Sequence, residues 1–251
     1  MLPKKFKPKY LYDLIRVGKD NDGGYLICKK SSLESSLLFS FGISDDISFE
    51  KNFKRINNCK VIAFDHTSTN NFFIKKILLN ILKINIFQFF KDIINFFNFS
   101  IFFNQKNCFL IKKKVEIKTN RSCNTISIKD IFKFTDNSSN IYFKIDIEGS
   151  EYRILDDLIN FSKNIIGLTI EFHEVDLNVD RILNFVKRFN LKLVHIHPNN
   201  YSDLGIGNIP KTLELSFSKY PAVIKKSLRF PHKLDQKNNK FSKDVKLVFK
   251  K

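Results

Sequence analysis

Three carboxylates stand where an apolar run of the chain ends, in the stretch IYFKIDIEGSEYRIL of residues 141–155. Asp146 and Glu148 are two residues apart, so on a strand their side chains project from one face, about 6.6 Å apart along it. Gly149 allows a turn into a helix, and Glu151 would lie in its first turn, where a carboxylate complements the helix dipole. The pattern predicts a buried strand that delivers acidic side chains to the edge of a sheet.

Four more apolar runs end in residues that can bind ligands or protons. These ends are Gly42 after LLFSF, Asp65 after CKVIAF, Glu171 and His173 in IIGLTIEFH, and His195 and His197 in LKLVHIH. Segments of helical periodicity separate the runs. Alternating strands and helices predict an α/β fold with a mostly parallel sheet and helices on both faces. Because ligands bind at the carboxyl ends of parallel strands, we expect these side chains to share one rim.

The rim suits a cationic cofactor better than a dinucleotide. Gly42 would let the backbone approach a ligand, and Asp65 could accept hydrogen bonds from two ribose hydroxyls. The segment FGISDD has a single glycine, so the glycine-rich dinucleotide fingerprint is missing. Asp45 and Asp46 would also repel a pyrophosphate. A cofactor with a sulfonium cation and a ribose but no phosphate fits this rim.

Histidines on the rim are candidates for proton transfer. His173, His195 and His197 could act as a general base near neutral pH, and Glu148 or Glu171 could orient one of them. The same mixture of carboxylates and imidazoles could bind a divalent metal ion. The spacing does not show that the side chains converge, so a metal site is the less favoured alternative.

The net charge of +18 would fit a nucleic-acid partner, but the composition offers another explanation. Only seven of the 43 basic residues are arginine, while lysine, asparagine, isoleucine and phenylalanine are abundant. That usage is typical of an AT-rich genome. Arginine, the better phosphate ligand, is not enriched. We therefore do not expect nucleic acid to be the partner.

The cysteines and the amino terminus indicate a reducing compartment. Cys28, Cys59, Cys108 and Cys123 are dispersed without a CxxC pair, which disfavours a zinc site. The chain begins with basic residues and prolines in place of an apolar signal region. We expect a cytoplasmic protein with free thiols.

We predict one domain over residues 1–251 with three additions to its core. Residues 1–36 form an amino-terminal hairpin or extension, and residues 227–251 a basic tail that straps the surface. Residues 71–103 are rich in phenylalanine but interrupted by four lysines and an aspartate, so they predict one or two amphipathic helices. We expect most of this segment to pack on the sheet. Its surplus apolar side chains would serve as a lid, an oligomer contact or a peripheral contact with the inner face of a membrane.

Several stretches together resemble one enzyme family. FSFGISDDISFEKNF, VIAFDHT, FKIDIEGSEYRIL, IGLTIEFHEVD, VHIHPNN and PKTLELSF are similar to the successive motifs of FkbM-type methyltransferases. The resemblance covers nearly the whole chain except residues 71–118. It implies S-adenosylmethionine as the cofactor and a Rossmann-like methyltransferase fold with a seven-stranded sheet.

The resemblance also implies roles for individual residues. Ser40, Gly42 and Ser44 would line the methionine part of the cofactor, and Asp65 would hold its ribose. The segment of residues 122–125, with Asn124, would lie near the adenine. Asp146 would border the centre of methyl transfer, with Glu148, His173 and His195 as further catalytic candidates.

The implied activity is O-methylation of a hydroxyl on a sugar, a glycan or another small metabolite. The charge leaves an RNA-binding protein or RNA methyltransferase as an alternative. The segment of residues 71–103 leaves a non-catalytic scaffold at a membrane surface as another.

Overall fold

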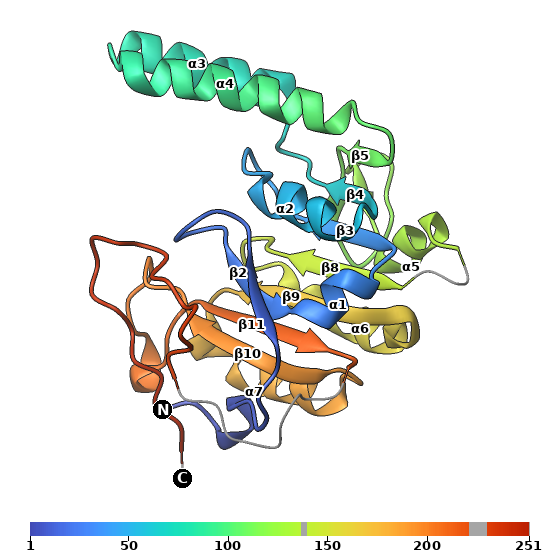
Figure 1. The fold of residues 1–251 in the computed structure, drawn as a ribbon, viewed down its shortest axis with the longest axis vertical. Coiled ribbons are helices and arrows are strands. Elements are labelled where there is room, and N and C mark those ends of the chain that lie inside the picture. The colour runs from blue at the N-terminus through green and yellow to red at the C-terminus, as the bar shows by residue number, and fades with distance from the viewer. Residues whose placement is uncertain (137–139, 221–229, 251) are drawn as a thin grey trace.

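The fold is taken from a computed structural model that describes residues 1–136, 140–220 and 230–250. Part of the predicted tail, residues 227–229 and 251, lies outside these ranges. Figure 1 shows a central sheet with helices against both faces and a helical hairpin that projects from one end of the molecule.

The sheet has seven strands in the order β10-β11-β9-β8-β3-β4-β5. Their bounds are β3 Leu37–Phe41, β4 Lys60–Phe64, β5 Cys108–Ile111, β8 Ile141–Ile145, β9 Ile165–Phe172, β10 Lys192–Pro198 and β11 Leu213–Ser218. Only β11 runs antiparallel to its neighbours in this sheet. The predicted Rossmann-like, mostly parallel seven-stranded methyltransferase fold is confirmed. The chain builds outward from β3 to β5 and then returns to β8, so the strand order reverses between β3 and β8.

The central strands β3, β4, β8 and β9 are buried on both faces, which explains why they are mostly apolar. On one face, Leu38 and Val61 pack with Phe49 and Phe53 of α2 (Ser48–Asn57). On the other, alternate strand residues pack against helices α5 (Ile128–Ile131), α6 (Leu155–Asn160) and α7 (Val175–Arg188). Helix α1 (Lys29–Glu34) lies beside α2.

An antiparallel hairpin of β1 (Leu14–Val17) and β2 (Tyr25–Cys28) leads into the sheet. Its connection contains the Asp22-Gly23-Gly24 turn that the sequence indicates, and Gly23 adopts a positive φ of 78°. A Cβ on Gly18 would lie 2.1 Å from a backbone oxygen, so the connection folds tightly on itself. The hairpin places Tyr25 at the carboxyl end of the sheet.

The helix predicted to begin near Glu151 starts later. Glu151–Arg153 form a short 3-10 turn, and α6 begins only at Leu155. Glu151 is fully buried, and its Oε1 accepts hydrogen bonds from the backbone N–H groups of Ile147 and Gly149. The Glu151 carboxylate thus bonds the backbone of the preceding turn, and the chain there takes a 3-10 conformation, which is tighter than an α-helix.

The phenylalanine-rich segment forms two helices, α3 (Asn70–Leu82) and α4 (Ile86–Phe103). The expectation that most of it packs on the sheet is wrong, because Phe73, Asp92, Phe99 and Phe102 are its only buried residues. The two helices pack on each other and stand off the body (Figure 1). After them come β5 and a small parallel pair, β6 (Lys114–Val115) and β7 (Thr125–Ile126).

Candidate active site

A cavity of about 750 Å³ opens at the carboxyl ends of β3, β4, β8 and β9. It lies at the strand-order reversal, where open α/β sheets bind ligands. Eight carboxylates line it, from Asp22, Asp45, Asp46, Glu50, Asp65, Asp146, Glu148 and Glu171. Four lysines oppose them: Lys19, Lys113, Lys114 and Lys144. A chain with a net charge of +18 therefore concentrates carboxylates around one cavity.

The loop after β3 passes very close to the end of β8. Gly42 has a φ of 70°, and a Cβ added there would lie 1.6 Å from the carbonyl oxygen of Asp146. The Lys144 ammonium donates to the Gly42 carbonyl oxygen at 2.7 Å and lies 3.5 Å from Asp146 Oδ2. Burial lowers the pKa of Lys144. The charges of Asp146, Glu50 and Glu171 raise it by more than burial lowers it, so the pKa is above its usual value. This cation joins the two strand ends on which the cavity is built.

Asp65 clamps the loops that follow β3 and β4. Its Oδ2 accepts from the N–H groups of Ile43 and Ser44 at 3.0 and 2.7 Å. Its Oδ1 accepts from the N–H and hydroxyl of Thr67, both at 2.6 Å, and from the N–H of Ser68 at 3.2 Å. Burial raises the pKa of Asp65, but these hydrogen bonds lower it below its usual value. The carboxylate is ionised and satisfied by the chain itself.

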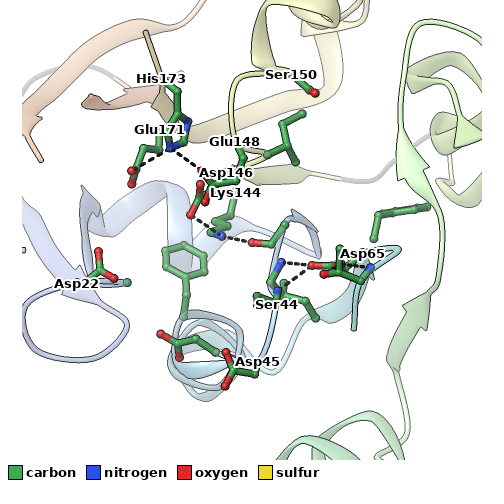
Figure 2. Close-up of a pocket in the computed structure, with 18 of the residues that line it drawn as sticks. Asp22, Ser44, Asp45, Asp65, Lys144, Asp146, Glu148, Ser150, Glu171 and His173 are labelled. Atoms are coloured by element: carbon green, nitrogen blue, oxygen red, sulfur yellow. Dashed lines mark hydrogen bonds and ion pairs between the residues drawn. The ribbon is translucent and has the colours of Figure 1, made fainter. Parts of the chain in front are cut away.

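Across the cavity, Asp146, Glu171 and His173 turn toward one another (Figure 2). The Tyr25 hydroxyl lies 3.2 Å from both Asp146 Oδ2 and Glu171 Oε2, and Asn199 donates to Glu171 Oε1 at 3.1 Å. Burial and the charges of Asp146 and Glu214 raise the pKa of Glu171 well above its usual range. Glu171 therefore stays protonated more readily than an ordinary glutamate, and added positive charge in the cavity would favour its ionisation.

His173 is held by a buried carboxylate. Its Nδ1 lies 3.1 Å from Glu151 Oε1, while its Nε2 lies 3.4 Å from Glu148 and 3.5 Å from Glu171. Burial lowers the pKa of His173. The hydrogen bond and charge of Glu151, together with the charges of Asp146 and Glu148, raise it by more than burial lowers it, so the pKa is above its usual value. An acceptor on Nδ1 places the proton there in the neutral ring and leaves Nε2 free to accept another.

His195 lies in a separate cluster, so the prediction that it joins the rim is wrong. Its Nε2 lies 3.0 Å from Asp235 Oδ1 of the tail, and His197 Nδ1 lies 3.4 Å from the same oxygen. The two histidines lower the pKa of Asp235. Strand β11 separates β10 from β9, and two strand spacings amount to about 10 Å. The tail also bonds His197 through Asn238, so these groups fasten the carboxyl-terminal segment.

The remaining predicted residues differ in position. Ser44 lines the cavity and binds Asp65, and Glu148 lines it with its side chain 85% exposed. Ser40 is buried outside the lining and bonds Glu50. Asn124 lies in the exposed turn before β7 and donates to the carbonyl of Lys112. Neither Ser40 nor Asn124 belongs to the cavity lining, but Asn124 bonds the segment that contains the lining residues Lys113 and Lys114, so its place near the adenine stays a prediction.

Several cavity residues were missed from the sequence. Tyr25 and Asn199 come from distant segments, and no local pattern marks them. Lys144, which lines the cavity, and Glu151, which is buried outside the lining and bonds His173, belong to the same KIDIEGSE motif as Asp146, so the motif itself contained their signal. Their roles were hidden because a buried lysine and a buried glutamate have the same local sequence appearance as exposed ones.

Within the described residues, Asp146, Glu171 and His173 place one ligand atom each within 4.8 Å of the others, as a metal site requires. The Lys144 ammonium already lies 3.5 Å from Asp146, however, and supplies positive charge there. We expect any turnover at this site to be unchanged by EDTA treatment and by added Mg²⁺ or Mn²⁺. Turnover before and after chelation, with metal content measured in the same samples, checks this. Activity that is lost with EDTA and restored by one ion would instead assign the three residues to a metal.

No known protein family matches the chain, and no curated protein does. Solved structures match with low similarity. An rRNA methylase from Streptococcus thermophilus is 12% identical over 76% of this chain and 92% of that one, with a TM-score of 0.37. TrmK of M. capricolum, in complex with S-adenosyl-homocysteine, is 15% identical over 82% and 70%, with a TM-score of 0.38. A precorrin-6y C5,15-methyltransferase from Geobacter metallireducens is 8% identical over 76% and 84%, with a TM-score of 0.36. These values are too low to support an inference about activity.

Proposed function

We propose that the protein is an S-adenosylmethionine-dependent methyltransferase of the FkbM type that methylates a hydroxyl oxygen. One observation carries the proposal: a strongly basic chain surrounds the cavity at its strand-order reversal with eight carboxylates. A ligand that combines a sulfonium, an ammonium and a ribose satisfies such a lining, whereas a phosphorylated one does not. The volume of about 750 Å³ is that of a small-molecule site.

The residues fit this cofactor at two places. Gly42 lets the loop after β3 pass against the end of β8, because a Cβ there would lie 1.6 Å from the Asp146 carbonyl oxygen, and this loop lines the cavity. At Asp65, the Thr67 hydroxyl makes the one bond to the carboxylate that comes from a rotatable side chain. A ribose hydroxyl can take its place without disturbing the four backbone N–H bonds. When bound, S-adenosylmethionine would supply an electrophilic methyl carbon.

His173 is the residue best placed to take the acceptor's proton. Its Nε2 faces the cavity wall of Glu148 and Glu171, and Glu151 keeps the other nitrogen protonated. As a proton moves onto Nε2, the imidazolium is stabilised by the carboxylates around it. The Asp146 carboxylate and Lys144 hold the end of β8 in place next to this centre.

The acceptor we propose is an uncharged hydroxyl compound, with a sugar or glycan unit favoured. Asn199, Tyr201, Ser202 and Thr212 line the side of the cavity next to Glu171 and offer amide, hydroxyl and aromatic groups. Tyr201 is 63% exposed, and its ring offers a surface on which a sugar ring can stack. The carboxylates at the cavity would repel the phosphates of RNA, which disfavours the alternative of an RNA substrate.

Calorimetry with S-adenosylmethionine and a transfer assay with its tritiated methyl group test the proposal together. We expect micromolar binding, and label in a polysaccharide or sugar fraction that survives ribonuclease. Label released by ribonuclease would move the acceptor to RNA and leave the cofactor assignment intact. If S-adenosylmethionine does not bind at millimolar concentration, the protein is not a methyltransferase.

A further inference from the structure

The α3–α4 hairpin exposes an unusual amount of apolar surface. Its helices and turn present twelve large apolar side chains to solvent: Ile74, Leu78, Leu79, Ile81, Leu82, Ile84, Ile86, Phe87, Phe90, Ile94, Phe97 and Ile101. Contiguous apolar surface on this scale marks a contact with another protein or with a membrane. Among the helices of the described residues, α4 alone is long and apolar enough to span a bilayer, and only 17% of it is buried.

Toward its tip, the hairpin has its polar groups inside. Asp92 is 4% exposed and accepts hydrogen bonds from Asn80 at 2.6 Å and from Gln88 at 2.7 Å, with Lys76 at 3.7 Å. A hairpin that is stable in water shows the opposite pattern, with apolar side chains between its helices and polar ones outside. In lipid, polar side chains must find their hydrogen-bond partners inside the protein, and the outer surface must be apolar. The tip of the hairpin has this arrangement.

The exposed charges of the hairpin all have one sign. Lys75, Lys83 and Lys91 are exposed, whereas Lys76 and Asp92 interact with each other between the helices. At a membrane surface, the apolar stem of a lysine can lie along the hydrocarbon while its ammonium stays among the headgroups. Acidic lipids attract that charge. The net charge of +18 adds attraction over a longer range.

We propose that the hairpin is a membrane anchor whose tip inserts into one leaflet of an anionic bilayer. The greatest exposure is at the turn, where Leu82, Ile84 and Phe87 are 79%, 82% and 82% exposed. The exposed apolar side chains lie along both helices as well as at the turn, so it is the exposed lysines and the inward-facing polar groups that favour lipid over a second copy of the chain. Both helices join the body at the same end, and the 13 residues of α3 reach only about 20 Å against a hydrocarbon core of about 30 Å. The hairpin therefore enters and leaves from one side without crossing.

The anchor also contacts the cavity rim. Lys76 of α3 pairs with Asp45, which lines the cavity, and Asn95 of α4 donates to the Asp45 carbonyl at 2.9 Å. Hairpin and rim are thus fixed to each other, and membrane attachment would set the orientation of the cavity relative to the bilayer.

Flotation with lipid vesicles tests the anchor. The full chain should float with vesicles of phosphatidylcholine and phosphatidylserine, and less with phosphatidylcholine alone. The tip variant Leu82→Ser/Ile86→Ser/Phe87→Ser should bind at least about a hundredfold more weakly, because it lacks three apolar side chains that the bilayer would bury. Replacing the exposed lysines (Lys75→Gln/Lys83→Gln/Lys91→Gln) should weaken the preference for phosphatidylserine, while the remaining positive charge of the chain retains part of it.

A matched control replaces three equally exposed apolar residues outside the hairpin, Leu177→Ser/Ile206→Ser/Phe241→Ser, and should float like the unmodified chain. Circular dichroism and thermal unfolding verify that each variant folds. An unmodified chain that stays with the soluble fraction overturns the anchor, as does equal loss in the control. A dimer that the tip variant dissociates, without flotation of either protein, would make a second copy the partner of the hairpin. Cofactor binding is measured separately, so a failed methyltransferase assignment would not affect this result.

Discussion

His173→Asn should lower the rate of methyl transfer about 10²- to 10⁴-fold while cofactor affinity stays nearly unchanged. The reason is local: the imidazole Nε2 lies among the cavity carboxylates, and no other histidine belongs to its cluster with Asp146 and Glu171 in the described residues. Steady-state kinetics with calorimetry on the same variant separates the two effects. Parallel losses in affinity and rate would indicate that His173 positions the cofactor and is not a base.

The pH profile gives a second readout on the same site. The pKa of His173 is raised above its usual 6.5, so the neutral base form accumulates, and the rate rises, only as the pH passes through that higher value. Glu151→Gln keeps the side-chain shape but removes the charge that raises the pKa. We expect the rate of this variant to rise at lower pH than the rate of the unmodified protein. If the acid side of the pH–rate profile is the same in the variant and in the unmodified protein, Glu151 does not act through His173.

Asp65→Ala should abolish detectable cofactor binding and also lower the free energy of unfolding by about 2–5 kcal/mol. The substitution leaves four backbone N–H groups without their acceptor in two loops of the cavity. Calorimetry for binding and urea unfolding for stability measure the two losses. Because the folded pKa of Asp65 is lowered, its contribution is complete above about pH 4 and fades as the pH falls through the folded value. The stability difference should therefore narrow in acid.

Thr67→Val is the matched control for this prediction. It removes the hydroxyl that donates to Asp65 Oδ1 but keeps the backbone bonds of the clamp. If a ribose hydroxyl replaces the Thr67 hydroxyl, the variant should bind the cofactor at least as well as the unmodified chain. A loss as large as that of Asp65→Ala would show that the ribose binds elsewhere.

The sequence was informative wherever burial imposes a pattern. Strands covered on both faces are mostly apolar, so β3, β4, β8 and β9 were visible as apolar runs with few polar residues. Parallel strands also bring their carboxyl ends to one edge, which is why Gly42, Asp65, Asp146, Glu171 and His173 could be expected at one rim without a structure. All five line the cavity.

The phenylalanine-rich segment shows where the same reasoning fails. Its apolar periodicity indicated helices, and α3 and α4 are present. Periodicity cannot show which surface covers an apolar face, because a sheet, a second copy and a lipid layer all favour the same residues. The sequence favoured packing on the sheet only because that is the usual way to cover an apolar helix face. The structure shows that this expectation is wrong.

For IYFKIDIEGSEYRIL, the sequence by itself determined a buried strand that ends in carboxylates at the rim. Only the tertiary structure decided what each carboxylate does. Asp146 lies by Lys144 and Tyr25, Glu148 stays exposed at the wall, and Glu151 is buried against His173, 22 residues later. Hydrogen bonds and pKa values depend on partners from distant segments and on burial, and neither is present in local spacing. The same holds for His195, which one intervening strand removes from a rim that its own sequence indicated.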